Sequence, residues 1–546
     1  MTETCRRLGT RQCVRTGVDV PVFKGRGRIA AMVAVVALLV SGTGAADGAE
    51  ESYGRPGDWP TWQGDRTGSR HNAAEWRINT HTAGKLIPKW AFAYSKTGFP
   101  AKSQPAVVDG SIYFGSPDGK FHALNAKSGA TEWSFDLNTV DPNGVVIDGP
   151  TVARGKVFFG DNRGFLYALD RKTGRVAWAE NTEPHAAGMH TSSPVYHNGR
   201  IYVGASSGEN INPDRTYPCC TFRGHIDAFD ADTGQLAWRH YTVPEPQAVG
   251  TWPSGATRFE PSGAGVWSSP IIDPRTDTLY VGTGQLYSGT TGDFDSLLAL
   301  DARSGAVRWK QQVTKADTWR LLCGFPDNDG YCPGQRDGTA LDFDIGATPN
   351  LFKVKGRTMV GVGQKSGVYH TFDARTGEVK WRRQLSVPMP GGGLSGLQWG
   401  SSYDGKSLYM ATYQANPGTL FALNPANGDV RWQTPNPADG CTTGGAAKFP
   451  DVCRLAHTPA VSSTHGLVYE GSNDGKMRIY DARDGKVLWT FDTIREFAGV
   501  NGPTGFGSAI SGNGGAVIAD GMLYVQSGYY PGYPSEHGTV LLAFGL

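Results

Sequence analysis

The sequence predicts an all-β fold, an eight-bladed β-propeller, from three observations. Seven times an acidic or amide residue is followed four places later by Gly and eight places later by Trp. Alternating apolar runs precede these turns, and the 75 Gly and 33 Pro leave few windows with a helical apolar period. A repeat of this length indicates units that bury their faces only against one another. The seven anchors are Trp133, Trp178, Trp238, Trp309, Trp381, Trp432 and Trp489.

Each repeat is predicted to form a strand, a tight turn and a second strand. The acidic or amide side chain caps the turn, and Gly supplies a positive φ. The following Trp then stands at a fixed depth, where its ring can dock on the next unit. Successive Trp anchors are 45, 60, 71, 72, 51 and 57 residues apart, a spacing that fits four short strands and variable loops. Each unit is therefore expected to be one propeller blade.

An eighth blade is predicted from the two ends of the chain. The C-terminal part offers three strands, near Ala516–Ile518, Met522–Gln526 and Thr539–Leu546, but no Trp turn after them. The missing strand is expected at Leu86–Phe92, with Trp90 as the eighth docking ring. Strand exchange between the termini closes the ring and removes the exposed edges of an open array.

The N-terminus has the pattern of a secretory signal. An apolar run, Ile29–Val40, follows Lys24, Arg26 and Arg28 and precedes Gly44-Ala45-Ala46. Its 12 residues are fewer than the roughly 20 that span a bilayer, so no stable membrane anchor is expected. We expect residues 1–46 to be a signal peptide, residues 47–546 to be the propeller, and the protein to be secreted, periplasmic or extracellular.

Charge and cysteine content fit an exported chain that does not bind nucleic acid. Without residues 1–46 the chain has 45 basic and 48 acidic residues, a net charge of −3, and no basic stripe. Six cysteines remain, which favours three disulfides. The local pairs are Cys323–Cys332 and Cys441–Cys453, and they leave the neighbours Cys219 and Cys220. These two form either a vicinal bridge or part of a swapped connectivity that ties loops together.

The longest loops between repeats are the expected place for chemistry, because a closed propeller gathers its functional groups at one mouth of the channel. Two loops carry carboxylates beside small residues, at Glu209 and at Asp344. Either carboxylate can ligate a hard cation, and Asp344 can also act as a general base. The alternative for each is a turn cap or a surface group.

Several segments between the repeats resemble the pyrroloquinoline quinone (PQQ) dehydrogenases, with the closest likeness to the polyvinyl alcohol dehydrogenases. The resemblance runs from Asp58 to the C-terminus. It is carried by Asp58-Trp59-Pro60-Thr61-Trp62, Cys219-Cys220-Thr221-Phe222-Arg223-Gly224, Val266-Trp267-Ser268-Ser269-Pro270, Asp344-Ile345-Gly346-Ala347-Thr348-Pro349-Asn350 and Gly363-Gln364-Lys365-Ser366-Gly367.

This resemblance implies a PQQ and calcium site. Thr191 and Ser206 match PQQ contacts, and Glu209 matches a calcium ligand at the family's spacing. Trp267 matches the Trp that stacks under the quinone, the alternative being an ordinary docking ring. Gln285 stands where the family has a calcium-binding Asn, which keeps the amide oxygen on a longer arm.

Further positions complete the implied site. Asp344 matches the catalytic base and calcium ligand, and Lys365 matches a basic residue that reaches the quinone oxygens, with a solvated loop charge as its alternative. Gln398 and Trp399 resemble a pair that closes the pocket, or they serve packing alone. The family's vicinal cysteines, followed by an Arg, usually lie one blade earlier, where this chain has the stretch ending at Asp148 without them.

The cysteine pair Cys219-Cys220 is therefore expected to reach the pocket from the next blade. Arg223 is expected to supply the missing positive charge. Another Glu of the family that touches PQQ falls near Lys102 here, and because PQQ carries three carboxylates, a Lys at that position would be a favourable exchange.

Two functions follow from these patterns. The first is a secreted quinoprotein that oxidises secondary alcohols, with polyvinyl alcohol or a related polyol as substrate. Because the chain has no Cys-x-x-Cys-His haem motif, its electrons must pass to a separate acceptor, a cytochrome or a quinone. The second is a non-catalytic propeller that acts as a binding or assembly scaffold, which the departures at Asp148 and Gln285 would permit.

Overall fold

The computed structural model describes residues 54–546 apart from 96, 98–100, 325–329, 334–340, 389–394, 414–416, 511, 513 and 529–537. The chain divides into Met1–Glu50 and Glu51–Leu546. The predicted signal peptide, residues 1–46, lies outside the described residues, as do residues 47–53. Within the described part, no helix has both the length and the apolar character needed to cross a membrane.

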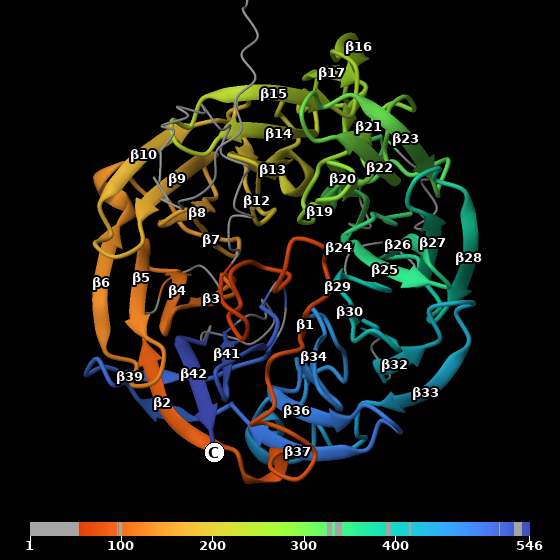
Figure 1. Ribbon diagram of the computed structural model, residues 1–546. Helices are drawn as coiled ribbons and strands as arrows, with labels where there is room; N and C mark the ends of the chain where they lie inside the picture. Colours follow the sequence, from red (N-terminus) through yellow and green to blue (C-terminus); the bar gives the residue numbers. More distant parts are fainter. Residues whose placement is uncertain are drawn as a thin grey trace, which may run out of the picture. The chain divides into compact units, whose positions relative to one another are not determined.

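Eight four-stranded antiparallel sheets form the second unit, and they are arranged radially in Figure 1. The first four are β3–β6 (Ala106–Val108, Ser111–Ser116, Lys120–Asn125, Thr131–Asp136), β7–β10 (Thr151–Ala153, Lys156–Gly160, Phe165–Asp170, Val176–Asn181), β12–β15 (Val195–His197, Arg200–Ser207, His225–Asp230, Leu236–Tyr241) and β19, β20, β22, β23 (Ile271–Asp273, Thr278–Gly282, Ser296–Asp301, Val307–Gln312).

The other four sheets complete the ring. They are β25–β28 (Asn350–Val354, Arg357–Gly363, Val368–Asp373, Val379–Gln384), β30–β33 (Ser402–Tyr403, Leu408–Ala411, Thr419–Leu423, Val430–Pro435), β34–β37 (Ser462–Thr464, Leu467–Gly471, Lys476–Asp481, Val487–Asp492) and β40, β41, β42, β2 (Val517–Ala519, Met522–Ser527, Val540–Gly545, Ile87–Ala93).

Short elements decorate this ring. The paired strands are β16–β17 (Gln247–Thr251, Thr257–Glu260), β18–β21 (Ser262–Gly263, Leu286–Ser288), β24–β29 (Ala347–Thr348, Trp399–Gly400) and β38–β39 (Glu496–Ala498, Thr504–Phe506). Single strands β1 (His71–Asn72) and β11 (Gly188–Met189) add to β34 and β13. The 3₁₀ helices are η1 (Ala83–Lys85), η2 (Leu137–Thr139), η3 (Gly208–Ile211), η4 (Leu321–Gly324) and η5 (Gly444–Lys448).

The predicted closure of the ring is confirmed. Strand β2, from the N-terminal part of the described chain, pairs antiparallel with β42 at the C-terminus, and Trp90 lies opposite Ala543. Figure 1 shows these two strands side by side. The eighth blade therefore takes its outer strand from the opposite end of the chain, so both ends of the propeller are held in one sheet.

Eight Trp side chains tie each blade to the next, as the repeat predicts. Each indole Nε1 donates a hydrogen bond to a carbonyl of the following blade or of the segment that leads into it. The pairs are Trp90 to Ala126, Trp133 to Arg171, Trp178 to Ala231, Trp238 to Ala302, Trp309 to Ala374, Trp381 to Pro425, Trp432 to Ala482 and Trp489 to Leu86.

The turn glycine serves two purposes, which Gly377 illustrates. Its φ is 72°, a conformation that residues with a side chain resist. A Cβ there would also lie 2.7 Å from the indole of Trp309 in the preceding blade. Asp373 caps the same turn by accepting the backbone N–H of Thr376 at 3.1 Å. Gly is thus required both by the turn and by the docked Trp.

All three disulfides form between the expected partners. Cys323–Cys332 and Cys441–Cys453 close local loops, and Cys219–Cys220 is a vicinal bridge. The swapped connectivity is therefore wrong.

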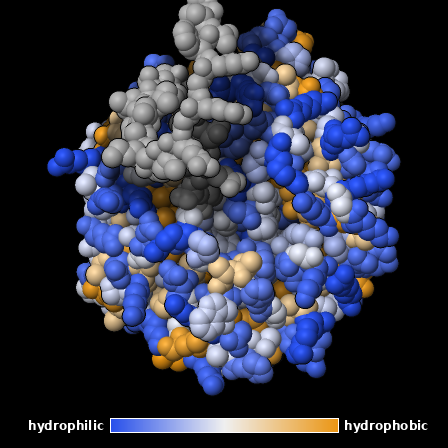
Figure 2. Space-filling view, in the orientation of Figure 1, coloured by the Kyte–Doolittle hydropathy of each residue, from blue (hydrophilic) through white to orange (hydrophobic). Residues whose placement is uncertain are grey.

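The face of the molecule in Figure 2 is mainly hydrophilic, with small scattered hydrophobic groups.

Candidate active site

Two kinds of loop open at the same end of each blade. The first and second strands of a blade pair antiparallel, so the segment that enters the first strand and the segment that leaves the second strand meet there. In three consecutive blades these segments carry six predicted site residues. Thr191, Trp267 and Asp344 precede β12, β19 and β25, and Glu209, Gln285 and Lys365 follow β13, β20 and β26.

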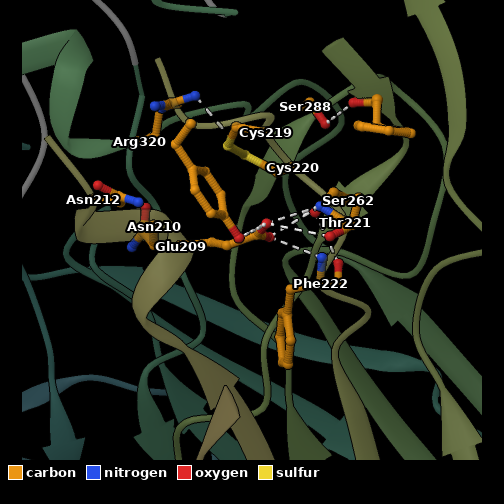
Figure 3. The surroundings of a disulfide bond; sticks show 12 residues. Glu209, Asn210, Asn212, Cys219, Cys220, Thr221, Phe222, Ser262, Ser288 and Arg320 are labelled. Atoms are coloured by element: carbon orange, nitrogen blue, oxygen red, sulfur yellow. Dashed lines mark hydrogen bonds between the residues drawn. A yellow bond between two sulfur atoms is a disulfide. The ribbon is translucent and has the colours of Figure 1, made fainter. Parts of the chain in front are cut away.

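Glu209 is buried in η3 and its carboxylate is held by the chain beside the disulfide. Oε2 accepts the N–H of Phe222 at 2.8 Å and that of Thr221 at 3.1 Å. Oε1 accepts the Tyr217 hydroxyl and the Thr221 N–H, both at 3.0 Å. Figure 3 shows this arrangement. Glu209 is therefore not a surface group: its hydrogen bonds position both the carboxylate and the Cys219–Cys220 segment.

Glu209, Cys219 and Cys220 bring possible metal-binding atoms within 4.8 Å of one another. The two sulfur atoms are bonded to each other, so neither is available as a thiolate ligand. This cluster accordingly offers a cation the oxygens of Glu209 alone.

The indole of Trp267 lies half-buried among polar and aromatic neighbours. The backbone carbonyl oxygen of Trp267 lies 3.5 Å from the Thr191 hydroxyl, which is itself 2.8 Å from the Ser206 hydroxyl. Its ring meets Trp399 edge to face, with centroids 5.1 Å apart. Gly346 lies against the indole so closely that a Cβ there would overlap it. Trp267 thus belongs to a built aromatic site and stands outside the ring of eight docking Trp residues.

Lys365 joins two buried carboxylates. Its Nζ lies 2.5 Å from Oδ2 of Asp344 and 2.9 Å from Oδ1 of Asp342. The same ammonium is 5.3 Å from the centroid of Trp267. Lys365 is therefore not a solvated loop charge, and it connects the carboxylates with the indole.

The two carboxylates differ in proton affinity. Burial raises the pKa of Asp342 to about 7, and the charge of Asp344 adds to this while Lys365 opposes it. Burial also acts to raise the pKa of Asp344, but Lys365, Asp342 and the N–H of Gln285 outweigh it and hold that pKa below the ordinary value. Near neutral pH, Asp344 is ionised and Asp342 is poised to exchange a proton.

Gln285 links Asp344 to η3. Its backbone N–H donates to Oδ1 of Asp344 at 2.7 Å, and its side-chain amide lies 3.2 Å from Oδ1 of Asn210. In the orientation that satisfies both groups, the amide nitrogen of Gln285 donates to the carboxylate oxygens of Asp344, and the amide oxygen accepts from the side chain of Asn210. Binding of a cation by the Gln285 oxygen would need this amide to turn its oxygen toward the ion.

Two more buried carboxyl groups lie behind this site, and sequence reasoning missed them. Burial, together with the charges of Asp342 and Asp344, raises the pKa of Asp317 to about 8. Burial and the charge of Asp317 raise the pKa of Asp295 well above its ordinary value. Oδ2 of Asp317 accepts the N–H of Phe343 at 2.6 Å. These residues support the Asp342–Asp344 segment, and isolated acidic residues in a sequence carry no signal for such a role.

The expected role of Arg223 does not match its position. Its guanidinium pairs with Glu245 at 2.6 Å, donates to the carbonyl of Val243 and covers the ring of Tyr241 at 3.7 Å. It is thereby committed to residues at and just beyond the outer strand of its own blade. The guanidinium beside the disulfide belongs instead to Arg320, whose Nη1 lies 3.9 Å from Sγ of Cys220.

Trp399, Gln398 and Asp148 differ in whether they contact the candidate site. Trp399 reaches Trp267, and its strand β29 pairs with β24 next to Asp344. Gln398 is buried, and its side-chain amide donates to the carbonyl of Ser395 at 2.9 Å. Asp148 is buried and accepts the N–H of Gly160 at 2.8 Å, and burial raises its pKa well above the ordinary value. The loop that lacks the family's Arg thus offers no cation at Asp148.

Comparison with known proteins identifies the family. A profile described as the β-propeller domain of glucose, ethanol and alcohol dehydrogenases (PQQ) matches residues 59–321, and one described as outer membrane protein assembly factor BamB matches residues 354–529. Polyvinylalcohol dehydrogenase of a Pseudomonas species is 32% identical over 516 residues, covering 90% of this chain and 77% of that protein. The chain belongs to the PQQ-dependent alcohol dehydrogenase family.

A second relative agrees with this membership, and solved structures share the fold. Polyvinylalcohol dehydrogenase of a Sphingopyxis species is 33% identical over 525 residues, covering 90% of this chain and 77% of that protein. Among solved structures, quinohemoprotein alcohol dehydrogenase of Comamonas testosteroni superposes with a TM-score of 0.64 at 19% identity, covering 90% of this chain and 81% of that one. A europium-containing methanol dehydrogenase gives a TM-score of 0.64 at 18% identity, covering 90% and 98%. As a PQQ-dependent dehydrogenase, this chain is an enzyme, and the non-catalytic scaffold is set aside.

Proposed function

We propose that this dehydrogenase oxidises secondary alcohol groups, those of polyvinyl alcohol or a related polyol, with PQQ as the hydride acceptor and calcium as a Lewis acid. One observation carries the proposal: Lys365 lies within reach of both Asp344 and the indole of Trp267, and Gln285 connects the same carboxylate to η3, which holds Glu209. The similarity to two polyvinylalcohol dehydrogenases supports the choice of substrate.

The residues present fit PQQ. Trp267 offers a flat indole face, and the Cys219–Cys220 bridge is a second compact wall beside Glu209. Thr191 and Ser206 supply hydroxyl groups next to Trp267, and Lys365 supplies a cation for the quinone oxygens. When bound, PQQ supplies the two-electron acceptor for the oxidation of the alcohol.

The oxygen donors also fit calcium. The side-chain amide of Gln285 lies between the carboxylate of Asp344 and Asn210 of η3, and its oxygen can turn toward an ion. Glu209 adds a buried carboxylate from the same helix. Carboxylate and amide oxygens are the ligands that calcium prefers, and the ion would polarise a quinone carbonyl. The longer arm of Gln285 keeps this chemistry at the position where the family has Asn.

The proton of the substrate hydroxyl is taken by Asp344 in this proposal. Its pKa is held below the ordinary value, so it is ionised at neutral pH and ready to accept. Asp342, with a pKa of about 7 and a shared ammonium partner, is the group to which that proton can pass. The buried setting excludes water, which strengthens each of these contacts.

The rest of the proposal concerns the surroundings of the reaction. Residues 1–46 act as a signal peptide, residues 47–546 form the catalytic propeller, and the enzyme works outside the cytoplasm. Because the chain has no haem-binding Cys-x-x-Cys-His motif, the electrons taken from the substrate would pass to a separate carrier, a cytochrome or a quinone.

Reconstitution tests the function. The full chain without residues 1–46 is incubated with PQQ and Ca²⁺, and dye reduction is followed with 2-propanol and with polyvinyl alcohol. We expect PQQ uptake at micromolar concentration and dye reduction with at least one of the two alcohols. Absence of PQQ uptake by the folded protein would sink the proposal, whereas uptake with activity on 2-propanol alone would correct only the polymer substrate.

A further inference from the structure

A buried arginine that sequence reasoning passed over borders the vicinal disulfide. Arg320 is 1% exposed, although arginine is among the residues least often buried without a partner. Among the described residues, the Cys220 sulfur at 3.9 Å is the one acceptor for its Nη1, and its Nε has no hydrogen-bond partner. Within the part of the chain that the structure describes, its guanidinium forms no ion pair. Such a group favours binding of an anion, and none of the described residues forms an ion pair with it.

The surroundings of Arg320 place it at the edge of the proposed cofactor site. Its guanidinium carbon lies 5.4 Å from the ring centroid of Trp252, whose Nε1 donates to the carbonyl of Cys219 at 2.9 Å. The backbone carbonyl oxygen of the preceding residue, Trp319, lies 3.4 Å from the side-chain amide nitrogen of Gln285. Figure 3 shows Arg320 beside the disulfide, on the side where Asn210 also lies. Arg320 therefore lies beside the disulfide, and the residue before it contacts Gln285, one of the proposed calcium ligands.

No ion pair joins Arg320 to an anion among the described residues. Burial lowers the pKa of Arg320, and the negative charge of Glu209 opposes that effect only in part. The oxygens of Glu209 already accept hydrogen bonds from Tyr217, Thr221 and Phe222. With respect to the described residues, the guanidinium thus keeps its Nε donor unpartnered next to the disulfide, in a setting of low dielectric where a carboxylate would bind strongly.

We propose that Arg320 binds a carboxylate of PQQ at the disulfide edge of the site, an inference that rests on the proposed function. An arginine presents parallel N–H donors that match a carboxylate, and PQQ carries three such groups. Arg223 forms an ion pair with Glu245, and the preceding blade has Asp148 in the stretch where the family has an Arg. Arg320 therefore supplies the positive charge for the PQQ carboxylate. In this chain the carboxylate is thus bound by an arginine that contacts the disulfide from about 100 positions further along the sequence, instead of by one that directly follows the cysteines.

The test measures PQQ binding to the cofactor-free protein by quenching of tryptophan fluorescence. We expect Arg320→Gln to weaken binding by about tenfold or more, because a charge-assisted contact is lost. Arg320→Lys, which keeps the charge, should lose less. The matched control is Arg258→Gln: Arg258 covers the same Trp252 ring at 5.1 Å but is already paired with Glu260, so its loss should leave PQQ affinity unchanged.

A second readout separates binding from folding. Removing an unpaired buried cation should leave the melting temperature of the cofactor-free protein unchanged or higher, and PQQ should raise it less in Arg320→Gln than in the wild type. Wild-type affinity in Arg320→Gln would overturn the inference and leave the proposed function intact. A lower melting temperature without PQQ in both Arg320 variants would also overturn it, since the guanidinium would then serve the fold. Failure of the wild type to bind PQQ would overturn the proposed function together with it.

Discussion

Nζ of Lys365 lies 2.5 Å from Oδ2 of Asp344. Both residues belong to the loops that form the candidate site at one end of three consecutive blades. The pair joins a loop that enters one blade's first strand to the loop that leaves its second strand. Because the same ammonium also contacts Asp342, one lysine sets the charge state of two buried carboxylates. This relationship determines at which pH the proposed base is ready to accept a proton.

Replacing Lys365 should shift the pH dependence of turnover upward. Lys365 lowers the pKa of both Asp342 and Asp344, so Lys365→Met raises both, and the carboxylates then hold protons to a higher pH. The acidic limb of kcat against pH should move up by about one unit or more. Lys365→Arg keeps the charge and should shift it less. An unchanged acidic limb in Lys365→Met would mean that these carboxylates do not control the rate.

Asp344→Asn should abolish most turnover while PQQ still binds. A general base contributes about 10²- to 10⁴-fold to a rate, and an amide cannot take the hydroxyl proton. Dye reduction at saturating alcohol measures the loss, and fluorescence quenching measures PQQ binding. Asp342→Asn is the informative comparison, because it removes a proton-holding neighbour with a pKa of about 7 while Asp344 remains. If Asp342→Asn alone abolished turnover, the base would be Asp342.

Gln285→Ala should raise the calcium concentration needed for activity by about tenfold or more, since one amide oxygen would be lost from the proposed ligand set. Activity is titrated with Ca²⁺ after treatment with a chelator. Gln312→Ala changes an amide on the outer strand β23 of the same blade and should not alter the titration. A calcium requirement that Gln285→Ala leaves untouched would remove Gln285 from the ligand set.

Trp90→Ala should destabilise the whole ring. Trp90 is buried, donates to the carbonyl of Ala126 at 3.1 Å and lies where a Cβ on Gly129 would come within 2.8 Å of its ring. Loss of a buried Trp costs about 3–5 kcal/mol, whereas Trp90→Phe keeps most of the contact and loses about 1 kcal/mol with the hydrogen bond. Denaturant unfolding measures both. The control is Trp76→Ala, because Trp76 is 70% exposed; equal losses at both positions would contradict the docking role.

The sequence by itself determined the propeller, its eight docking Trp residues and its closure. The pattern of which Asp373, Gly377 and the following Trp are one example recurs along the chain at fixed spacing. It can be read from the sequence because a turn that needs a capping side chain and a positive φ depends on residues close together in the chain. The disulfide pairs Cys323–Cys332 and Cys441–Cys453 were equally local. Resemblance to relatives supplied the names of the site residues, of which Asp344, Lys365 and Trp267 do lie together.

Only the tertiary structure decided which charges meet in the site. Arg223 follows the cysteine pair in sequence, yet its side chain leaves the site for Glu245, while Arg320 arrives beside the disulfide from the next blade. Likewise Asp342, Asp317 and Asp295 become proton-binding groups only through burial near Lys365 and near one another. The direction of a long side chain and the pKa of a carboxyl depend on contacts between blades, and spacing within one blade carries no record of those contacts.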